Sequence, residues 1–246
     1  MRNAIVLLAL LFAGCKDKTK TATPKVGSAS ASTPGSGSAT GEPARGSAAE
    51  PQQNELRLPK LAGTPPVKTT KPIDAAKAKT LSEKGYDGFT KDVRVADDKG
   101  IELRYLTKAR PVIMVSVQAT KCFDCLPMEE AKWKDKAESL KTLIGPELKD
   151  HKDTVFESGM TKIGETPYAY SYHVGYNISP DPETGIAGAY GTAYALYYND
   201  GVNMIRVVSE YKDDVPKTRD DMVNLTPKED LEVIAKAFMD QFVHAW

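Results

Sequence analysis

Three cysteines are the residues of this chain with the most readily interpreted chemistry. Cys15 stands alone near the N-terminus, whereas Cys122 and Cys125 form a C-x-x-C pair. A thiolate can be acylated, can pair in a disulfide or can act as a redox nucleophile. If Cys15 is modified, the other two cysteines remain as one pair, which suits an oxidising compartment. The spacing predicts a short Cys122–Cys125 disulfide, either a structural staple before a helix or a redox site.

The N-terminal segment predicts export. Arg2 is followed by the unbroken apolar stretch Ala4–Phe12, which is far shorter than the roughly 20 residues that span a bilayer. The small residues Ala13 and Gly14 then precede Cys15, as a signal protease requires. We therefore predict a signal peptide over residues 1–14.

Residues 12–15 resemble the bacterial lipobox, with Phe12 at the position where leucine is commonest. The resemblance implies that Cys15 becomes the mature N-terminus and carries several acyl chains, such as palmitate, which anchor the protein to a membrane. Lys16 follows, rather than the Asp that favours inner-membrane retention, so the outer membrane facing the periplasm is favoured. The alternative is an ordinary secretory signal with an incidental cysteine.

Residues 15–75 have the composition of a tether. They are rich in Ser, Gly, Ala, Thr, Pro and Lys, most clearly in SASASTPGSGSATGEPARGSAAEPQQ. Such a segment buries too little apolar surface to offset the entropy lost on ordering, so we expect a disordered linker. A flexible chain of about 50 residues has a mean reach of roughly 40 Å.

Residues 80–246 carry the patterns of a single globular domain. Strands are predicted over 93–106 (a hairpin turning at 98–100), 111–117, 155–160, 166–176, 190–198 and 202–211, with Asn199-Asp200-Gly201 as a hairpin turn. Helices are predicted from Pro127 to Ile144 and from a capping box at Thr226. Strands in blocks, separated by two helices, predict an α+β fold: a mainly antiparallel sheet of about six or seven strands with two principal helices packed on it.

The element order and several local segments are similar to the PsbP-like/Mog-like group of α/β/α sandwiches. The similarity covers residues 86–243: a strand and long helix over 111–144, the segment FESGMTKIGETPYAYSYHV, a tyrosine-rich hairpin and a C-terminal helix with Phe238 and Phe242. The resemblance implies a binding or assembly role and carries over no catalytic residue, since a shared fold alone is a weak guide to function.

A thioredoxin-like fold is the alternative. An apolar strand precedes Cys122, a helix is predicted after Cys125, and Pro167 could be the cis-proline of that fold. Cys122 would then be the nucleophile and Cys125 the resolving thiol. No crossover helix fits between Phe156 and Pro167, however, and the charge of Asp124 opposes a thiolate. A structure decides the question: a helix there favours the thioredoxin-like fold, and a continuous hairpin favours the other.

Other candidate sites are weaker. Tyr168, Tyr170, Tyr172 and Tyr194 are either a packed sheet face or a speculative groove for a ligand. No metal site is predicted, because the three histidines are scattered and the chain has no second C-x-x-C. No cofactor is predicted either. The zero net charge argues against a nucleic-acid partner.

These features predict an envelope lipoprotein, held to the membrane through lipid on Cys15, whose soluble domain serves binding or assembly rather than catalysis. The partner would be an envelope protein or a small ligand. The alternatives are a membrane-tethered thiol–disulfide oxidoreductase that uses Cys122 and Cys125, and a purely structural envelope protein.

Overall fold

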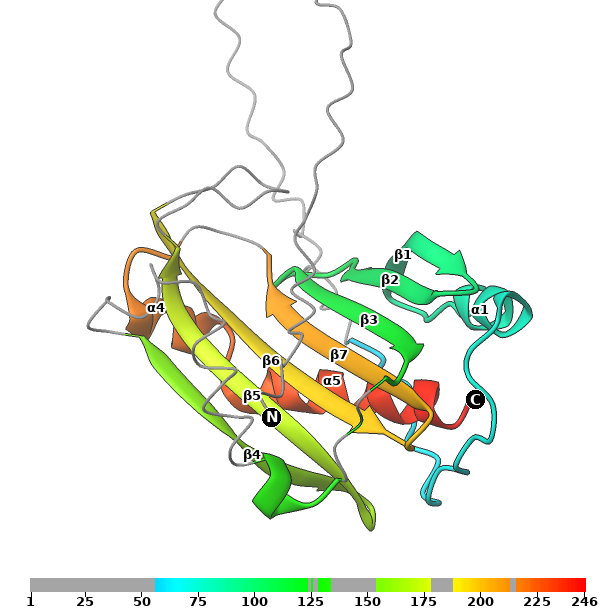
Figure 1. Cartoon of the computed structure of the whole chain (residues 1–246). Helices are drawn as coiled ribbons and strands as arrows, with labels where there is room; N and C mark the ends of the chain where they lie inside the picture. Colours follow the sequence, from blue (N-terminus) through cyan, green and yellow to red (C-terminus); the bar gives the residue numbers. More distant parts are fainter. Residues whose placement is uncertain (1–55, 124, 126–127, 134–153, 178–187, 213–215) are drawn as a thin grey trace, which may run out of the picture. The chain divides into compact units, whose positions relative to one another are not determined.

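The computed structural model shows an antiparallel sheet with helices packed against it (Figure 1). The chain divides into two units, Met1–Glu50 and Pro51–Trp246, and the described residues all belong to the second unit. The structure describes residues 56–123, 125, 128–133, 154–177, 188–212 and 216–246.

Seven strands make up the sheet, and every neighbouring pair is antiparallel. Their bounds are β1 Phe89–Asp97, β2 Gly100–Thr107, β3 Ile113–Lys121, β4 Val155–Ile163, β5 Thr166–Asn177, β6 Ala189–Asn199 and β7 Asn203–Tyr211. The strand order across the sheet is β1-β2-β3-β7-β6-β5-β4. Strands β4 to β7 therefore form a meander whose last strand lies beside β3, and the α+β class predicted from the sequence is confirmed.

The segment between Phe156 and Pro167 distinguishes the antiparallel α+β fold from the thioredoxin-like alternative. It is a continuous antiparallel hairpin, in which β4 and β5 pair from Val155 opposite Val174 to Ile163 opposite Thr166. No parallel strand pair occurs among the described residues, whereas a β-strand–helix–β-strand unit requires one. The described topology therefore does not support the thioredoxin-like alternative.

Three helices are described along their full length: α1 Ala75–Ser82, α4 Arg219–Leu225 and α5 Lys228–Val243. Helix α5 packs against β7, β6 and β3, α1 packs against β1 and β2, and α4 packs against β5 and β6. Figure 1 shows α5 lying along one face of the sheet, under β6 and β7. The sequence analysis predicted α5 but neither of the two short helices.

The main core lies between α5 and the sheet. The stripe predicted for α5 is buried, from Leu231 through Ile234 to Phe238 and Phe242. Alternate residues of the central strands face it, since a strand sends successive side chains to opposite faces. Burying each such side chain contributes about 1.5–3 kcal/mol. The core side chains of the three central strands are Ile113, Val115, Val117, Ala119, Tyr190, Tyr194, Leu196, Tyr198, Ile205, Val207 and Tyr211.

The N-terminus of α5 differs from the prediction. A capping box at Thr226 was expected, but Pro227 is the N-cap and no side chain caps the helix. The hydroxyl of Thr226 is buried and makes no hydrogen bond to another group. Pro227 itself has an extended backbone, with φ of −56° and ψ of 149°, and its ring offers no side-chain acceptor for the first helical N–H groups.

The second helix predicted from the sequence is only partly described. Residues 130–133 are helical, and residues 134–144 of the predicted helix lie outside the described residues. Trp133 at the end of this stretch is buried, and its ring centroid lies 5.9 Å from that of Tyr197 in β6.

The last part of the segment predicted as a tether, residues 15–75, is described. Residues 56–73, which we call the strap, are described and lie against the folded domain, with Leu56 and Leu58 packed on the core and Ile73 buried. The prediction used side-chain composition, but backbone groups of the strap provide much of its attachment.

The C-terminal turn of α5 holds the first half of the strap. The buried carboxylate of Asp240 accepts a hydrogen bond from the N–H of Ala62 at 2.6 Å. The Nε2 atom of His244 lies 2.7 Å from the carbonyl oxygen of Thr64. The strap is therefore fastened to residues far away in the sequence, which periodicity in the sequence does not reveal.

Candidate functional site

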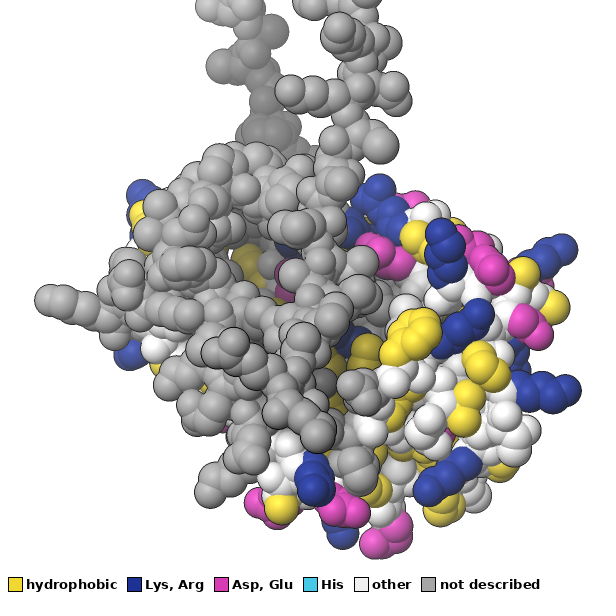
Figure 2. Space-filling view, in the orientation of Figure 1, with side chains coloured by type: hydrophobic (Ala, Val, Ile, Leu, Met, Phe, Trp, Pro, Cys, Tyr) yellow, Lys and Arg dark blue, Asp and Glu magenta, His cyan; other side chains and the backbone are white. Residues whose placement is uncertain are grey.

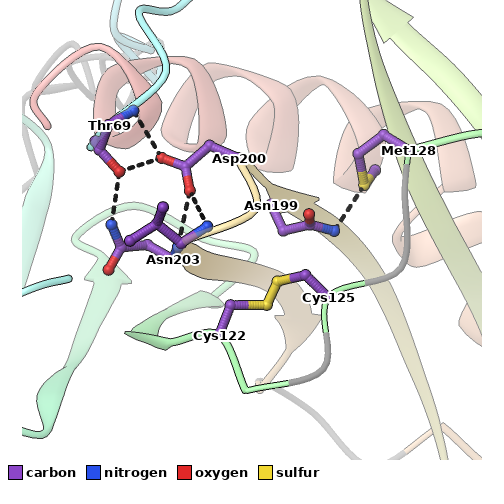
Figure 3. Close-up of a disulfide and its surroundings, with 8 residues drawn as sticks. Thr69, Cys122, Cys125, Met128, Asn199, Asp200 and Asn203 are labelled. Atoms are coloured by element: carbon purple, nitrogen blue, oxygen red, sulfur yellow. Dashed lines mark hydrogen bonds between the residues drawn. A yellow bond between two sulfur atoms is a disulfide. The ribbon is translucent and has the colours of Figure 1, made fainter. Parts of the chain in front are cut away.

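The end of the sheet at which β3 finishes and β7 begins brings the cysteine pair next to a network of polar side chains (Figure 3). Cys122 and Cys125 form a disulfide, and their Cα atoms are 5.6 Å apart, within the normal range for such a bond. The backbone N–H of Cys122 donates to the carbonyl oxygen of Val202 at 2.8 Å. The loop that carries the disulfide is thereby attached to the turn between β6 and β7.

Asp200 organises this turn and also holds the strap. Its Oδ1 accepts hydrogen bonds from the N–H groups of Val202 and Asn203, at 2.9 and 2.7 Å. Its Oδ2 accepts from the N–H of Thr69 at 3.0 Å and from the hydroxyl of the same residue. Burial alone would raise the pKa of Asp200, but these hydrogen bonds outweigh burial and lower the pKa.

Asn203 completes the attachment of the strap. Its side chain is buried, its Oδ1 accepts from the N–H of Ile73 at 2.8 Å, and its Nδ2 donates to Thr69 and to the carbonyl oxygen of Lys71. On the far side of the turn, Asn199 directs its Nδ2 towards the sulfur of Met128 at 3.2 Å. The polar side chains shown in Figure 3 therefore hold separate chain segments together.

The carboxylate of this arrangement is fully engaged. Four hydrogen bonds, from the N–H groups of Thr69, Val202 and Asn203 and the hydroxyl of Thr69, occupy both oxygens of Asp200. A general base needs a free lone pair directed at a substrate, so Asp200 is not placed as one. The network is instead suited to fixing the shape of the surface around it.

That surface presents two highly exposed apolar side chains. Phe123, inside the disulfide-closed loop, is 90% exposed, and Val67 in the strap is 83% exposed, the two highest values among the large apolar residues described. The segments that carry these two residues are attached to the same turn, because Cys122, next to Phe123, is hydrogen-bonded to Val202, and Thr69, two residues after Val67, is hydrogen-bonded to Asp200. We call this region, defined by Phe123, Val67 and the turn at 200–202, the apolar tip.

Pro167, the proposed third member of a redox site, does not lie beside the cysteines. It is in β5, and β7 and β6 separate that strand from β3. The one cis peptide bond among the described residues precedes Pro111, not Pro167. The geometry therefore lacks the proline contact expected of a thioredoxin-like site, and Asp124 lies outside the described residues.

The four tyrosines considered for ligand binding face the helical layer. Tyr168, Tyr172 and Tyr194 are buried, and Tyr170 stacks on Tyr194 with ring centroids 5.5 Å apart. The ammonium group of Lys228 at the start of α5 lies 5.4 Å from the ring centroids of both Tyr170 and Tyr172. Burial raises the pKa of Tyr168 and of Tyr194. These rings pack under a helix, so the structure shows no open aromatic groove at them.

His173 occupies the opposite face of β5, between Phe156 in β4 and Ala193 in β6. Burial, with a smaller contribution from the positive charge of Arg206, lowers its pKa to about 4. In the described part of the chain no group of three or more His, Cys, Asp or Glu side chains could hold a metal ion.

The lipidation site predicted at Cys15 lies outside the described residues. No helix in the described ranges is both long and apolar enough to cross a membrane. The residues that the sequence analysis missed are Phe123, Asp200 and Asn203. The turn signal at 199–201 located Asp200 but not its contact with Thr69, because only the fold brings the strap to that turn.

Comparison with known proteins finds no matching family model, no similar curated protein and no similar solved structure.

Proposed function

We propose that this protein is an envelope lipoprotein, anchored through acyl chains on Cys15, whose folded domain binds a partner and does not catalyse a reaction. The apolar tip is the observation that carries the proposal. A phenylalanine in a loop closed by Cys122 and Cys125 loses little conformational freedom on binding, and aromatic side chains often dominate binding energy.

The sequence of residues 1–15 supports the anchored location. The apolar stretch, the small residues and the lone cysteine together fit a lipoprotein signal. The pairing of the other two cysteines fits an oxidising compartment outside the cytoplasm. The outer membrane, with the domain in the periplasm, remains the favoured location. A finer relationship to the PsbP-like/Mog-like group is part of the proposal, supported by the antiparallel sheet with helices packed on it and by no specific motif.

Metabolic labelling with a radioactive fatty acid tests the anchor. The wild-type chain is expected to carry the label and to fractionate with membranes, and Cys15→Ser is expected to lose the label. A Cys122→Ser and Cys125→Ser double variant is the matched control, which should keep the label. An unlabelled mature wild-type chain would exclude the lipoprotein proposal.

The redox behaviour of the Cys122–Cys125 pair separates binding from thiol–disulfide exchange. A structural staple is expected to have a reduction potential below about −300 mV and no insulin-reduction activity. A potential in the range of the oxidoreductases, together with turnover that the Cys122→Ser variant abolishes, would replace the binding proposal with the enzymatic alternative.

A further inference from the structure

We infer that His244 is a pH-sensitive switch for the strap: the charged imidazolium holds the strap closed, and the neutral ring lets it open more often. His244 caps the C-terminal end of α5, between that helix and the strap. The inference goes beyond the proposed function, because the attachment of the strap does not depend on what the domain binds or on how the chain is anchored.

Both ring nitrogens of His244 face oxygen atoms that accept hydrogen bonds. Nδ1 lies 2.8 Å from the carbonyl oxygen of Asp240, and Nε2 lies 2.7 Å from the carbonyl oxygen of Thr64. A carbonyl oxygen only accepts, and a neutral imidazole carries a single N–H group. Both contacts are therefore hydrogen bonds only when the ring is doubly protonated and positively charged.

The buried carboxylate of Asp240 supplies the opposite charge. Its side chain is 3% exposed, its Oδ2 accepts from the N–H of Ala62 at 2.6 Å, and its Oδ1 lies 3.4 Å from Nδ1 of His244. When the ring loses one proton, the other stays at Nδ1, where two oxygen atoms of Asp240 are close. Nε2 then directs a lone pair at the carbonyl oxygen of Thr64, and an attractive contact becomes a repulsive one.

The contact with Thr64 is one of a series. Nε2 of Gln241 donates to the carbonyl oxygen of Lys60 at 2.7 Å, so the last turn of α5 binds backbone groups of the strap at residues 60, 62 and 64. The contact at Thr64 is the one in this series that depends on a histidine proton, and histidines ordinarily change charge between about pH 5 and 8. Its loss weakens the series without removing it, so the strap opens more often while its closed form remains the main one.

Other titratable groups lie on the elements packed around His244. In addition to Asp240, these are Lys84 and Tyr86 after α1, Tyr168 in β5, Arg57 and Lys60 in the strap, and the terminal carboxylate of Trp246. Burial is the main cause that raises the pKa of Tyr86 and of Tyr168, so both phenols stay neutral across the range in which histidines titrate. Among these groups, the carboxylate of Asp240 is the one in contact with the ring.

Hydrogen exchange of the full-length chain in detergent micelles at pH 5.5 and pH 8.0 tests the switch. Protection is measured at single amides by mass spectrometry and corrected for the pH dependence of exchange in unstructured peptides. The N–H of Ala62 is expected to be at least about tenfold less protected at pH 8.0, because a hydrogen bond donated by a charged group is lost. The N–H groups of Thr69 and Ile73, which Asp200 and Asn203 hold without a histidine, should keep their protection.

Global unfolding would give the opposite trend. Burial lowers the pKa of His173 to about 4, so its contribution to stability is larger at pH 8.0 than at pH 5.5. A loss of protection at Ala62 at the higher pH therefore reports local opening of the strap.

Three variants separate the charge of His244 from other effects. His244→Gln, which does not titrate, should give the same low protection of Ala62 at both pH values. His244→Lys, which stays positively charged over this range, should give high protection at both. His173→Gln is the matched control and should keep the wild-type difference.

Three outcomes would overturn the inference. They are equal protection of Ala62 at the two pH values in the wild type, a pH dependence that persists in His244→Gln, and a parallel loss of protection at Thr69 and Ile73. The last outcome would indicate that the whole strap responds to another titrating group.

Discussion

His173 shows how a single partly buried side chain can contribute to the acid sensitivity of the domain. Its imidazole belongs to the face of β5 opposite the tyrosines, and burial lowers its pKa to about 4. The unfolded chain has a histidine pKa of about 6.5, so between these values the unfolded state binds more protons than the folded state. The contribution of His173 to the free energy of unfolding is therefore fully present above about pH 6.5 and is lost as the pH falls towards 4.

Replacing His173 by glutamine should remove part of this dependence. Between pH 7 and pH 4 the wild-type free energy of unfolding is expected to fall by about 1–3 kcal/mol more than that of His173→Gln. Urea unfolding at several pH values measures the difference. Parallel pH profiles for the two proteins would contradict a buried neutral histidine.

The cysteine pair gives a second prediction for individual residues. Cys122→Ser with Cys125→Ser should lower the free energy of unfolding by about 1–2 kcal/mol, because a loop this short removes little chain entropy from the unfolded state. Phe123→Ser, which keeps the disulfide and alters an exposed side chain, should change stability by less than about 0.5 kcal/mol. An unchanged melting temperature in the double serine variant would argue against a structural role for the disulfide.

Among the structural elements, the β6–β7 turn depends on one carboxylate. Asp200→Ala removes the acceptor for four hydrogen bonds and should cost about 2–3 kcal/mol at pH 7. The folded-state pKa of Asp200 is depressed, so its contribution is present above the unfolded pKa of about 4 and is lost as the pH falls below it. The difference from wild type should therefore shrink at pH 3.

Asp98→Ala is the matched control for that measurement. Asp98 is an exposed acidic residue in the turn between β1 and β2, so its loss should change the free energy of unfolding by less than about 0.5 kcal/mol. Equal destabilisation by the two variants would show that general charge effects, and not the turn contacts, explain the result.

Strand β2 begins where a side chain cannot fit. A Cβ atom on Gly100 would overlap the carbonyl oxygen of Ala119 in β3, and the residue has φ of +151°. Gly100→Ala is expected to cost about 2–3 kcal/mol through overpacking against the backbone. Gly164→Ala, with φ of +57° and no atom near the added Cβ, should cost only about 1 kcal/mol. Thermal and urea unfolding of the Gly100→Ala and Gly164→Ala proteins measures the loss of stability in each. Similar losses would show that backbone strain, and not the contact with Ala119, dominates at Gly100.

The strands and the long helix could be predicted from the sequence more fully than the contacts between them. Every strand of the sheet and helix α5 lay in a segment with the correct periodicity, because alternation and the 3.6-residue repeat are local patterns. Helices α1 and α4 were missed because each covers about two turns and carries few apolar residues to mark a buried face. The position of β3 beside β7 and the contact of Asp200 with Thr69 join distant residues and leave no local signature.

On the scale of the whole molecule, the strap links a predicted membrane tether to the folded domain. Its backbone is held at one end by Asp240 and His244 in α5 and at the other by Asp200 and Asn203. Strain on the tether would therefore be transmitted to the last helix and to the β6–β7 turn. The side chains that hold the strap bind mainly its backbone groups, whereas Leu56, Leu58, Ile73 and the hydroxyl of Thr69 are the strap side chains that add to the attachment.

Limited trypsin digestion of the membrane-anchored chain should reveal where the tether ends. Trypsin is expected to cut after Arg45, in the segment that composition predicts to be disordered, and to release a fragment that begins at Gly46. Cleavage after Lys68 should be slow although this lysine is exposed, because the N–H of Thr69 is held by Asp200 and a protease needs the backbone free.

The Asp200→Ala variant should move the N-terminus of the released fragment to Thr69, whereas Asp98→Ala should leave it at Gly46. N-terminal sequencing of the soluble fragment distinguishes the two sites. Rapid cleavage after Lys68 in the wild type would show that the strap detaches readily in solution. A fragment that begins at Gly46 but stays with the membrane would place a membrane attachment within the folded domain. Release of that fragment at high salt would identify the attachment as electrostatic, since salt screens attraction between exposed charges.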